Sequence, residues 1–276
     1  MVIKYLGTAA AEGVPAVFCH CDVCNYSRQM RGRNIRTRSQ VIIDNMLLID
    51  FGPDTYWHSL QHGINLADIH HCLISHPHAD HLYPDDLKDR RRSRANLKPG
   101  TPPLSIYGSR SVLKALQPYS GDTVTKDASV VFHELFPYKK SNVAGYFVTP
   151  LPAVHGTEMP FVYIIEHDNV RYLYGHDSDI LRAETLDYIK QNQIRFDCIS
   201  LDCTEGIKHI DYEGHMNLER FLVMCEKLTN ISAIDQMTVK IASHFSHNGL
   251  VSYDDILRHV EDQNITIAYD GMEVRI

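Results

Sequence analysis

The sequence predicts one α/β domain, and three observations support this prediction. Short apolar runs that suit strands recur along the chain, and longer stretches between them suit helices. The 276 residues are 44% hydrophobic and 22% charged, which suffices for one large domain or two small ones. Because no proline- or serine-rich linker and no internal repeat divides the chain, we expect residues 1–276 to form a single domain.

The first half of the chain contains five predicted strands and two predicted helices. The strands cover 2–8, 40–44, 46–50, 71–74 and 104–108, and the helices cover 55–70 and 109–116. Asp44-Asn45 joins the second and third strands and is typical of a hairpin turn.

The second half continues the same pattern. Strands are predicted at 146–154, 161–166, 170–174, 199–204 and 239–243, and helices are predicted after 214–217 and over 257–260. His167-Asp168-Asn169 joins the second and third of these strands as another hairpin. The chain ends in a predicted strand pair, 265–269 and 272–276, around Asp270-Gly271.

Composition excludes several classes of protein. The formal net charge of -7 disfavours a general nucleic-acid binder, which needs a basic face for phosphate contacts. The apolar run at the N-terminus is too short for a signal peptide, and no stretch approaches the roughly 20 apolar residues of a membrane span. The 17 His suggest metal binding, and 7 Cys, an odd number, argue against a disulfide framework. We therefore expect a soluble protein of the cytoplasm without membrane contact.

Four metal-capable side chains gather in one short stretch, which holds His76, His78, Asp80 and His81. The stretch follows the apolar run 71–74, and a tight loop at a strand end can turn all four side chains inward, whereas a strand would alternate them. Neutral imidazole and carboxylate suit zinc, manganese and iron. A His-rich surface loop is the alternative, and the complete pattern after an apolar strand disfavours it.

Three further candidate ligands also follow apolar strands. They are His155, Asp177 and His244. Each of them alone would pass for a loop residue. Residues at one end of packed sheets can converge even when they are distant in sequence, so the three are expected near the first four.

A second possible metal centre lies near the N-terminus. Cys19, Cys21 and Cys24 place three thiolates within six positions, and such a knuckle can hold a tetrahedral zinc if a fourth ligand arrives from elsewhere. Adjacent positions make His20 an awkward fourth ligand. Free cysteines in a loop are the alternative interpretation.

The string His76-Pro-His78-Ala-Asp80-His81 resembles the signature of the metallo-β-lactamase superfamily. The resemblance implies an αββα sandwich, in which two mixed β-sheets pack face to face with helices outside and a two-metal site lies at one edge. It implies that one metal is held by His76, His78 and His155, that the second is held by Asp80, His81 and His244, and that Asp177 bridges both. An aspartate at the bridging position resembles the phosphodiesterase pattern, whereas a cysteine would resemble the lactam-cleaving branch.

The turn that begins at Asp50 resembles the aspartate–glycine turn of the same superfamily. Asp50 is therefore expected to orient a ligand histidine without binding metal, and capping of a helix or turn is the alternative. The basic run 90–94 is expected to be a solvated helix face, and contact of one of its arginines with a substrate phosphate is the alternative.

Two features resemble the cyclic phosphodiesterases of the carbon–phosphorus lyase pathway, which serves phosphonate breakdown. They are the Cys19, Cys21 and Cys24 knuckle and His247, three residues beyond His244, and Asp270-Gly271-Met272 is also similar. The resemblance implies that the three cysteines and His247 hold one structural zinc. It also places His215 near the reacting phosphate, while a capping or core histidine is the alternative.

The expected function is a metal-dependent phosphodiesterase with two divalent catalytic metals, manganese or zinc. A hydroxide that bridges the metals would attack a small cyclic phosphodiester, such as a phosphoribosyl cyclic phosphate or a 2′,3′-cyclic nucleotide. The predicted catalytic residues are Asp80, as a ligand, and His215, which would bind the phosphate or protonate the leaving alkoxide.

Other functions remain open at this point. A tRNA 3′-end processing endonuclease would share the fold and ligands, but the charge of -7 and the lack of a clear basic arm disfavour it. A non-catalytic metal-binding accessory protein is disfavoured by the intact ligand set, and thioester or lactam hydrolysis is disfavoured by the cysteine knuckle. A homodimer is compatible with the sequence, which does not define the native metal.

Overall fold

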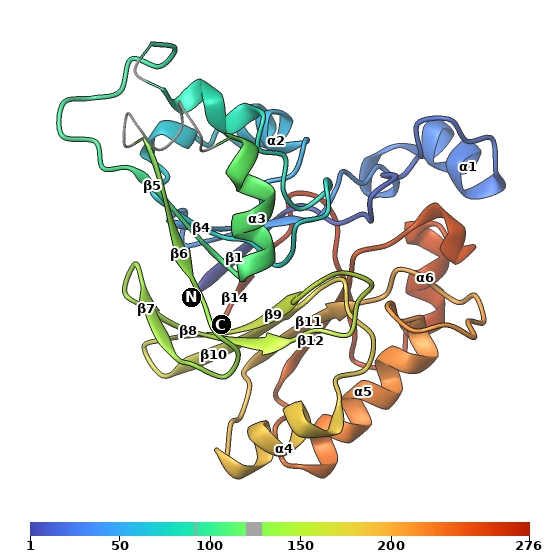
Figure 1. Ribbon diagram of the computed structural model, residues 1–276. Coiled ribbons are helices and arrows are strands. Elements are labelled where there is room, and N and C mark those ends of the chain that lie inside the picture. Colours follow the sequence, from blue (N-terminus) through green and yellow to red (C-terminus); the bar gives the residue numbers. More distant parts are fainter. Residues whose placement is uncertain (92, 120–128) are drawn as a thin grey trace.

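The computed structural model describes residues 1–91, 93–119 and 129–276. Two mixed β-sheets of seven strands each pack face to face, with helices on both outer faces (Figure 1). The αββα sandwich implied by the sequence is thereby confirmed. Among the described residues, none of the helices has the length and apolar content that a membrane crossing requires.

The first sheet has the strand order β14-β1-β2-β3-β4-β5-β6. Its strands are β1 (Val2–Gly7), β2 (Gln40–Ile43), β3 (Leu47–Ile49), β4 (His71–Leu73), β5 (Leu104–Gly108), β6 (Val130–Glu134) and β14 (Glu273–Arg275). From β3 to β6 the neighbouring strands run parallel. The carboxyl ends of β3 and β4 therefore lie at the same edge.

The second sheet has the order β13-β12-β11-β10-β9-β8-β7. Its strands are β7 (Ser141–Val143), β8 (Tyr146–Pro152), β9 (Phe161–His167), β10 (Val170–Gly175), β11 (Cys198–Asp202), β12 (Val239–Ser243) and β13 (Thr266–Ile267). Strands β10 to β13 are parallel, so their carboxyl ends also share one edge. Ala9 pairs with Phe245 just beyond β1 and β12, and this contact joins the two sheets at that edge.

Side chains alternate between the two faces of each strand, and they form three apolar clusters: one between the sheets and one on the outer face of each sheet. In β2, Val41 and Ile43 belong to the cluster between the sheets, whereas Ile42 points to the outer face, where Val112 and Leu116 of a helix cover the sheet. The helices are α1 (Asp22–Met30), α2 (Thr55–His62), α3 (Arg110–Tyr119), α4 (Ala183–Gln191), α5 (Leu218–Asn230) and α6 (Tyr253–Val260). In Figure 1, α2 and α3 lie outside the first sheet and α4, α5 and α6 outside the second.

Both predicted hairpins are confirmed, because β2 pairs with β3 and β9 pairs with β10 in antiparallel register. The predicted helix over 55–70 stops at His62, where Gly63 adopts a left-handed conformation, and a 3-10 turn follows at Leu66–Asp68. The predicted terminal strand pair is wrong. The Ala268 amide donates to Ala242 of the second sheet, whereas the Gly271 amide donates to Tyr5 of the first, so this segment crosses between the sheets.

The two termini of the described chain meet at one point of the first sheet. Strand β14 pairs with β1, the Met1 nitrogen donates to the Ile276 carbonyl at 3.0 Å, and the Ile276 amide donates back to Met1 at 3.1 Å. Both termini lie close together in Figure 1.

Candidate metal centre

The seven side chains predicted as catalytic metal ligands lie together at one edge of the sheets. They form two groups that share one carboxylate, and the ligand atoms of each group lie within 4.8 Å of one another. The groups are His76, His78, His155 and Asp177, and Asp80, His81, Asp177 and His244. All seven are buried or half-buried. The structure thus brings the predicted residues together, and their binding of metal stays a prediction.

Backbone conformation turns three of the site residues out of their strands. Asp50, Asp177 and His244 follow β3, β10 and β12, and their φ angles are 66°, 57° and 63°. Residues other than glycine rarely adopt this left-handed region, and such outliers cluster at functional sites. The turn directs each side chain toward the edge that the two sheets share.

Hydrogen bonds outside the cluster define which nitrogen of each imidazole carries the proton. His81 Nδ1 lies 2.8 Å from the Asp50 carboxylate, and His155 Nδ1 lies 3.2 Å from the Gly214 carbonyl. Both partners accept hydrogen bonds, so the Nδ1–H groups donate to them. In the neutral rings the Nε2 atoms then present lone pairs to the site.

The other two buried rings are held through hydroxyl groups. Ser75 Oγ donates to Asp50 at 2.8 Å and lies 3.0 Å from His76 Nδ1. Thr204 Oγ1 lies 2.8 Å from both Asp202 Oδ2 and His244 Nδ1. The Ser75 hydrogen is engaged by Asp50, and the Thr204 hydrogen by Asp202 or by the His244 carbonyl, also at 2.8 Å, so in both cases the histidine Nδ1–H donates to the hydroxyl oxygen. The Nε2 atoms of these rings also face inward as lone pairs.

These inward lone pairs face one another at short distances. His78 Nδ1 lies 3.0 Å from both His76 Nε2 and His155 Nε2, and at most one proton, on His78, is available to the three nitrogens. His81 Nε2 lies 3.3 Å from His244 Nε2. Asp177 Oδ1 is also buried, and its neighbours are His215 Nδ1 at 3.1 Å and His155 Nδ1 at 3.4 Å. Facing acceptors are unfavourable unless a cation lies between them, so the donor set fits divalent metals.

The carboxylates around His81 also favour a positive charge at this position. Burial opposes charge on its ring, but the carboxylates of Asp80 and Asp50 outweigh burial and raise the pKa of His81 well above its usual value. A proton or a metal cation can meet this demand, and neutral imidazole is the form that binds metal.

His215 lies beside the ligands and not among the predicted seven. Its Nδ1 is 3.1 Å from Asp177 Oδ1 and 3.2 Å from Asp202 Oδ2, and its ring is partly exposed. Burial lowers the pKa of His215, but Asp202 and Asp177 outweigh burial and raise it to about 9. The two carboxylates thus favour the charged form of the ring, which can donate protons into the site. The group Asp177, Asp202, His215 and His244 also has metal-ligand spacing, so its position alone leaves a ligand role open.

Asp202 is a site residue that the sequence analysis did not single out. It is fully buried at the end of β11 and accepts hydrogen bonds from the amides of Thr204 and Met216, both at 2.9 Å. Its position at the end of an apolar strand, the criterion that selected Asp177 and His244, was the signal available in the sequence.

A cavity of about 270 Å³ opens over the cluster, and most of the residues that line it have polar side chains. Besides ligands and His215, its lining includes Glu12, Glu205, Tyr212, Ser246 and Asn248. The hydroxyl of Tyr212 donates to Glu205. The lining therefore suits a small ligand with many hydrogen-bonding groups.

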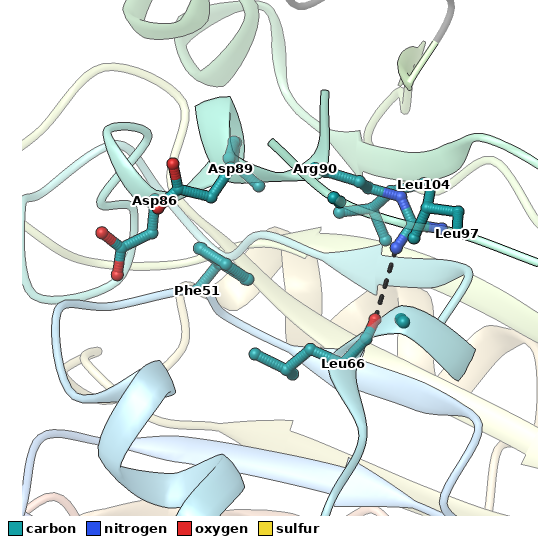
Figure 2. Close-up of a pocket in the computed structure, with 10 residues that line it drawn as sticks. Phe51, Leu66, Asp86, Asp89, Arg90, Leu97 and Leu104 are labelled. Atoms are coloured by element: carbon teal, nitrogen blue, oxygen red, sulfur yellow. Dashed lines mark hydrogen bonds between the residues drawn. The ribbon is translucent and has the colours of Figure 1, made fainter. Parts of the chain in front are cut away.

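A second cavity, of about 200 Å³, is mainly apolar and lies elsewhere (Figure 2). Phe51, Leu66, Leu97 and Leu104 line it together with Arg90, which donates to the Leu66 carbonyl at 3.3 Å. Residues Asp86–Arg90 form a short 3-10 turn, whereas a helix face was predicted for this region. None of the described arginines of the run 90–94 lines the polar cavity, and Arg92 lies outside the described residues. The structure thus gives no support to phosphate contact from this run.

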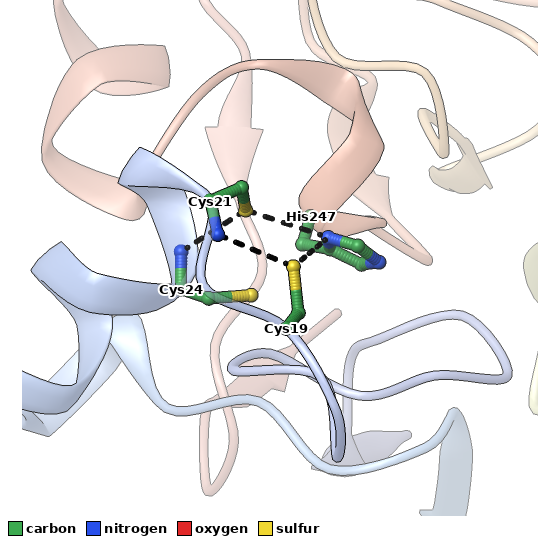
Figure 3. Close-up of side chains that lie close together, drawn as sticks. All are labelled: Cys19, Cys21, Cys24 and His247. Atoms are coloured by element: carbon green, nitrogen blue, oxygen red, sulfur yellow. Dashed lines mark hydrogen bonds between the residues drawn. The ribbon is translucent and has the colours of Figure 1, made fainter.

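The predicted structural zinc ligands also lie together (Figure 3). His247 Nδ1 is 3.4 Å from Cys19 Sγ and 3.5 Å from Cys21 Sγ, and Cys24 completes the group. A tetrahedral zinc with usual bond lengths separates sulfur from nitrogen by about 3.6 Å. All cysteines are free thiols, so no disulfide competes for these sulfurs. The geometry fits a closed zinc site, in which the metal would keep the thiols deprotonated.

Comparisons with known proteins agree with this architecture. The model of the beta-lactamase superfamily domain matches residues 45–245. A curated octanoyltransferase from Porphyromonas gingivalis (strain ATCC BAA-308 / W83) is 25% identical over 285 residues, which cover 98% of this chain and 51% of that protein. The chain thus spans about half the length of the curated relative that it matches.

Solved structures share the fold over nearly the whole chain. A diphosphatase from the PhnP family has a TM-score of 0.76 at 22% identity, covering 99% of this chain and 96% of its own. Zn²⁺-bound PqqB from Methylobacterium extorquens has a TM-score of 0.75 at 19% identity, covering 100% of both chains. The short form of human tRNase Z has a TM-score of 0.62 at 16% identity, covering 100% of this chain and 99% of that one.

Proposed function

The chain belongs to the β-lactamase superfamily, and we propose that within this family it is a dinuclear metal-dependent phosphodiesterase for a small cyclic phosphodiester. The observation that carries the proposal is the set of facing ligand atoms, in which histidine lone pairs and carboxylates converge around the shared Asp177. Metal-dependent hydrolysis is the chemistry of the superfamily, and the fold likeness to a PhnP-family diphosphatase supports a phosphorus substrate.

The seven ligands would hold two divalent cations, manganese or zinc. Cations bound there would lower the pKa of a water molecule and offset charge on the phosphoryl oxygens. Asp50, Ser75 and Thr204 hold the histidine rings so that their lone pairs stay directed inward. This fixed orientation removes the need to reorganise the site during reaction.

His215 would act on the substrate. Asp202 keeps its ring charged and faces Nδ1, so a ring proton is available at neutral pH for a phosphate oxygen or for the leaving alkoxide. Proton donation to the alkoxide would balance the proton lost by the attacking water. Asp80 would take part as a ligand.

The polar cavity of about 270 Å³ favours a small substrate over a polymer or an acyl chain. A phosphoribosyl cyclic phosphate or a 2′,3′-cyclic nucleotide has the phosphate and hydroxyl groups that Tyr212, Ser246 and Asn248 can bind. We place this activity in phosphonate metabolism and in the cytoplasm, a reducing compartment in keeping with the free thiols.

We also propose that Cys19, Cys21, Cys24 and His247 bind one structural zinc. Four protein ligands complete the tetrahedral shell, so no position is open for substrate. The zinc would tie the N-terminal loop to the segment three residues beyond His244.

A turnover panel tests the proposal. The protein loaded with manganese or zinc is assayed against cyclic phosphodiesters, linear phosphodiesters, tRNA precursors and an octanoyl thioester. We expect turnover of a cyclic phosphodiester with the highest kcat/KM. Preference for a tRNA precursor would replace the proposal by 3′-end processing, and no turnover at full metal loading would indicate an accessory protein.

Octanoyl ester or thioester hydrolysis is a second candidate because the curated relative is an octanoyltransferase. Only about half of that protein is matched, and most residues that line the cavity over the described cluster are polar, which suits an octanoyl chain less well than a substrate with many hydrogen-bonding groups. Preferred cleavage of the thioester in the same panel would select this function.

A further inference from the structure

A line of hydrogen bonds, half-buried at Asp270 and Thr37 and buried from His58 onward, runs from near the C-terminus to the back of the metal centre. Asp270 Oδ2 lies 2.6 Å from Thr37 Oγ1, which lies 2.7 Å from His58 Nε2. His58 Nδ1 lies 2.6 Å from Gln40 Oε1, and Gln40 Nε2 donates to the Asp50 carbonyl at 2.8 Å. None of the first four residues belongs to the predicted ligands of either metal centre.

The position of Gln40 determines the proton on His58. Gln40 Nε2 donates to Asp50 O and to Thr55 Oγ1, each at 2.8 Å, and the Thr55 hydroxyl itself donates to Gly52 O at 2.7 Å. The amide group is therefore oriented, and its oxygen faces His58 as an acceptor. His58 Nδ1 must carry a hydrogen, which leaves Nε2 of the neutral ring as an acceptor.

Counting hydrogens shows that the line needs one further proton. Thr37 Oγ1 has a single hydrogen but makes two contacts, with His58 Nε2 and with Asp270 Oδ2. If the ring is neutral and Asp270 is ionised, one of these contacts joins two acceptors at 2.7 Å or less, which is unfavourable in a buried site. A proton on the Asp270 carboxyl completes both hydrogen bonds.

The surroundings favour Asp270 over His58 as the place of that proton. Burial raises the pKa of Asp270 to about 6, although the hydroxyl of Thr37, its amide, which donates to Oδ2 at 2.6 Å, the hydroxyl of Thr8 and the charge of Arg36 oppose the rise. Burial lowers the pKa of His58 to about 4, with His62 acting in the same direction and Asp54 opposing it. Arg38 pairs with that Asp54 carboxylate at 3.1 Å.

The end of the line bears on the metal centre through Asp50. This residue has a φ of 66°, and its carboxylate receives the amide of Ser75 and the ring of His81. Gln40 holds the carbonyl of the same residue, so the unusual backbone conformation depends on where Gln40 is held. A Cβ at Gly7 would meet His58 Cε1 at 2.9 Å, so the ring has little room to move.

We propose that Asp270, Thr37, His58 and Gln40 are positioning residues that hold Asp50 in place, and that the line is complete when the Asp270 carboxyl is protonated. The proposal goes beyond the proposed function, since the line would orient the metal-binding loop for any substrate. Its tests below read stability, ring protonation and metal retention, so they can fail or succeed independently of the phosphodiesterase assay.

The first test substitutes an amide N–H, which does not titrate, for the O–H of the Asp270 carboxyl. In Asp270→Asn the side-chain N–H can donate to Thr37 at every pH, whereas the wild-type carboxyl loses its proton as pH rises. A raised pKa in the folded state means that the contribution to stability is complete at low pH and is lost as pH rises through about 6. We expect the melting temperature of Asp270→Asn, relative to wild type, to increase between about pH 5 and about pH 8. A constant difference over this range overturns the proposal.

The second test determines which nitrogen of the His58 ring carries hydrogen, and it uses the wild-type protein. Nitrogen-15 NMR of the His58 ring should show a neutral ring with hydrogen on Nδ1. An Nε2–H tautomer or a charged ring at neutral pH would overturn the assignment.

The third test links the line to the metals with a matched pair of variants. Thr37→Val removes the hydroxyl and keeps the shape, whereas Thr37→Ser keeps a hydroxyl. We expect Thr37→Val to release the His- and Asp-bound metals at about tenfold lower chelator concentration, as for residues that orient metal ligands, and Thr37→Ser to match wild type. Equal retention in both variants contradicts a positioning role.

Discussion

At the scale of single residues, the site depends on one carboxylate and on the orientation of rings. Asp177 contacts histidines of both groups, with Oδ2 3.0 Å from His76 Nε2 and 3.2 Å from His81 Nε2. Positions after apolar runs made His76 and Asp177 candidates, and the resemblance of the histidine string to a known signature supplied the full predicted ligand set. Asp202 could have been found in the same way, because it ends the apolar strand β11. The roles of the Ser75 and Thr204 hydroxyls could not be predicted, because they depend on contacts with side chains that follow neighbouring strands.

Asp177→Ala should lose both catalytic metals and at least about 10³-fold of phosphodiester turnover, because it removes the shared ligand. Metal analysis after gel filtration, together with a kinetic assay, checks this. Asp177→Asn serves as control, since Asn tolerates the left-handed backbone at this position while removing the charge. Retention of two metals by both variants would contradict the two-metal assignment.

His215→Ala should keep its metals and lose about 10²- to 10⁴-fold in rate, the usual contribution of an acid–base group. Because the Asp202 carboxylate favours the charged form of the His215 ring and raises its pKa, the rate that depends on this proton should fall on the alkaline side of the pH profile. This alkaline limb should be absent from the variant. A loss of metal instead would show that His215 is a ligand.

At the scale of elements, the residues of the metal centre lie at the ends of strands, and close contacts between backbone segments hold their loops in place. Apolar runs predicted most strands of both sheets to within a few residues. They missed α1, α4, β6 and β7, which are short or have mixed exposure, such as the half-exposed β6. The pair at 265–276 failed because Asp270-Gly271 looks like a hairpin turn, while the hydrogen bonds of its neighbours go to opposite sheets.

Gly52→Ala should disrupt the metal centre by displacing the backbone of the loop that carries two predicted ligands. A Cβ at Gly52 would meet the Asp80 carbonyl oxygen at 2.0 Å, so the loop that carries Asp80 and His81 must shift. We expect metal affinity to fall by about tenfold or more, measured by competition with a chelator. Gly156→Ala is the matched control, because a Cβ there meets no atom within 4 Å. Equal affinities would show that this contact does not set the loop position.

Cys21→Ser should remove one zinc equivalent and lower stability by about 2 kcal/mol, or about 5 °C in Tm, since metal binding is part of the folding free energy. The catalytic metals should remain at least partly bound. Growth in manganese should exchange those metals and leave zinc at the thiolates, which favour it. Absence of an anomalous zinc peak among Cys19, Cys21, Cys24 and His247 would rule the site out.

At the scale of the whole molecule, the fold follows from alternation on two sheets that each bury both faces. Each inner face belongs to one common core, and each outer face has its own helices. Composition alone allows many α/β folds. The arrangement became predictable only when the histidine string had been matched to a known signature. The order of strands and the crossing of the C-terminal segment depend on long-range pairing, which local sequence does not encode.

The meeting of Met1 and Ile276 makes the backbone almost a closed ring. A short linker between these two residues would therefore close the backbone without changing the strand order of either sheet. A partner domain joined at either terminus would leave from the same place, at the start of β1, while Ala9 and Phe245 mark the metal centre beyond the other end of that strand. Such an attachment would leave the polar cavity open to solvent.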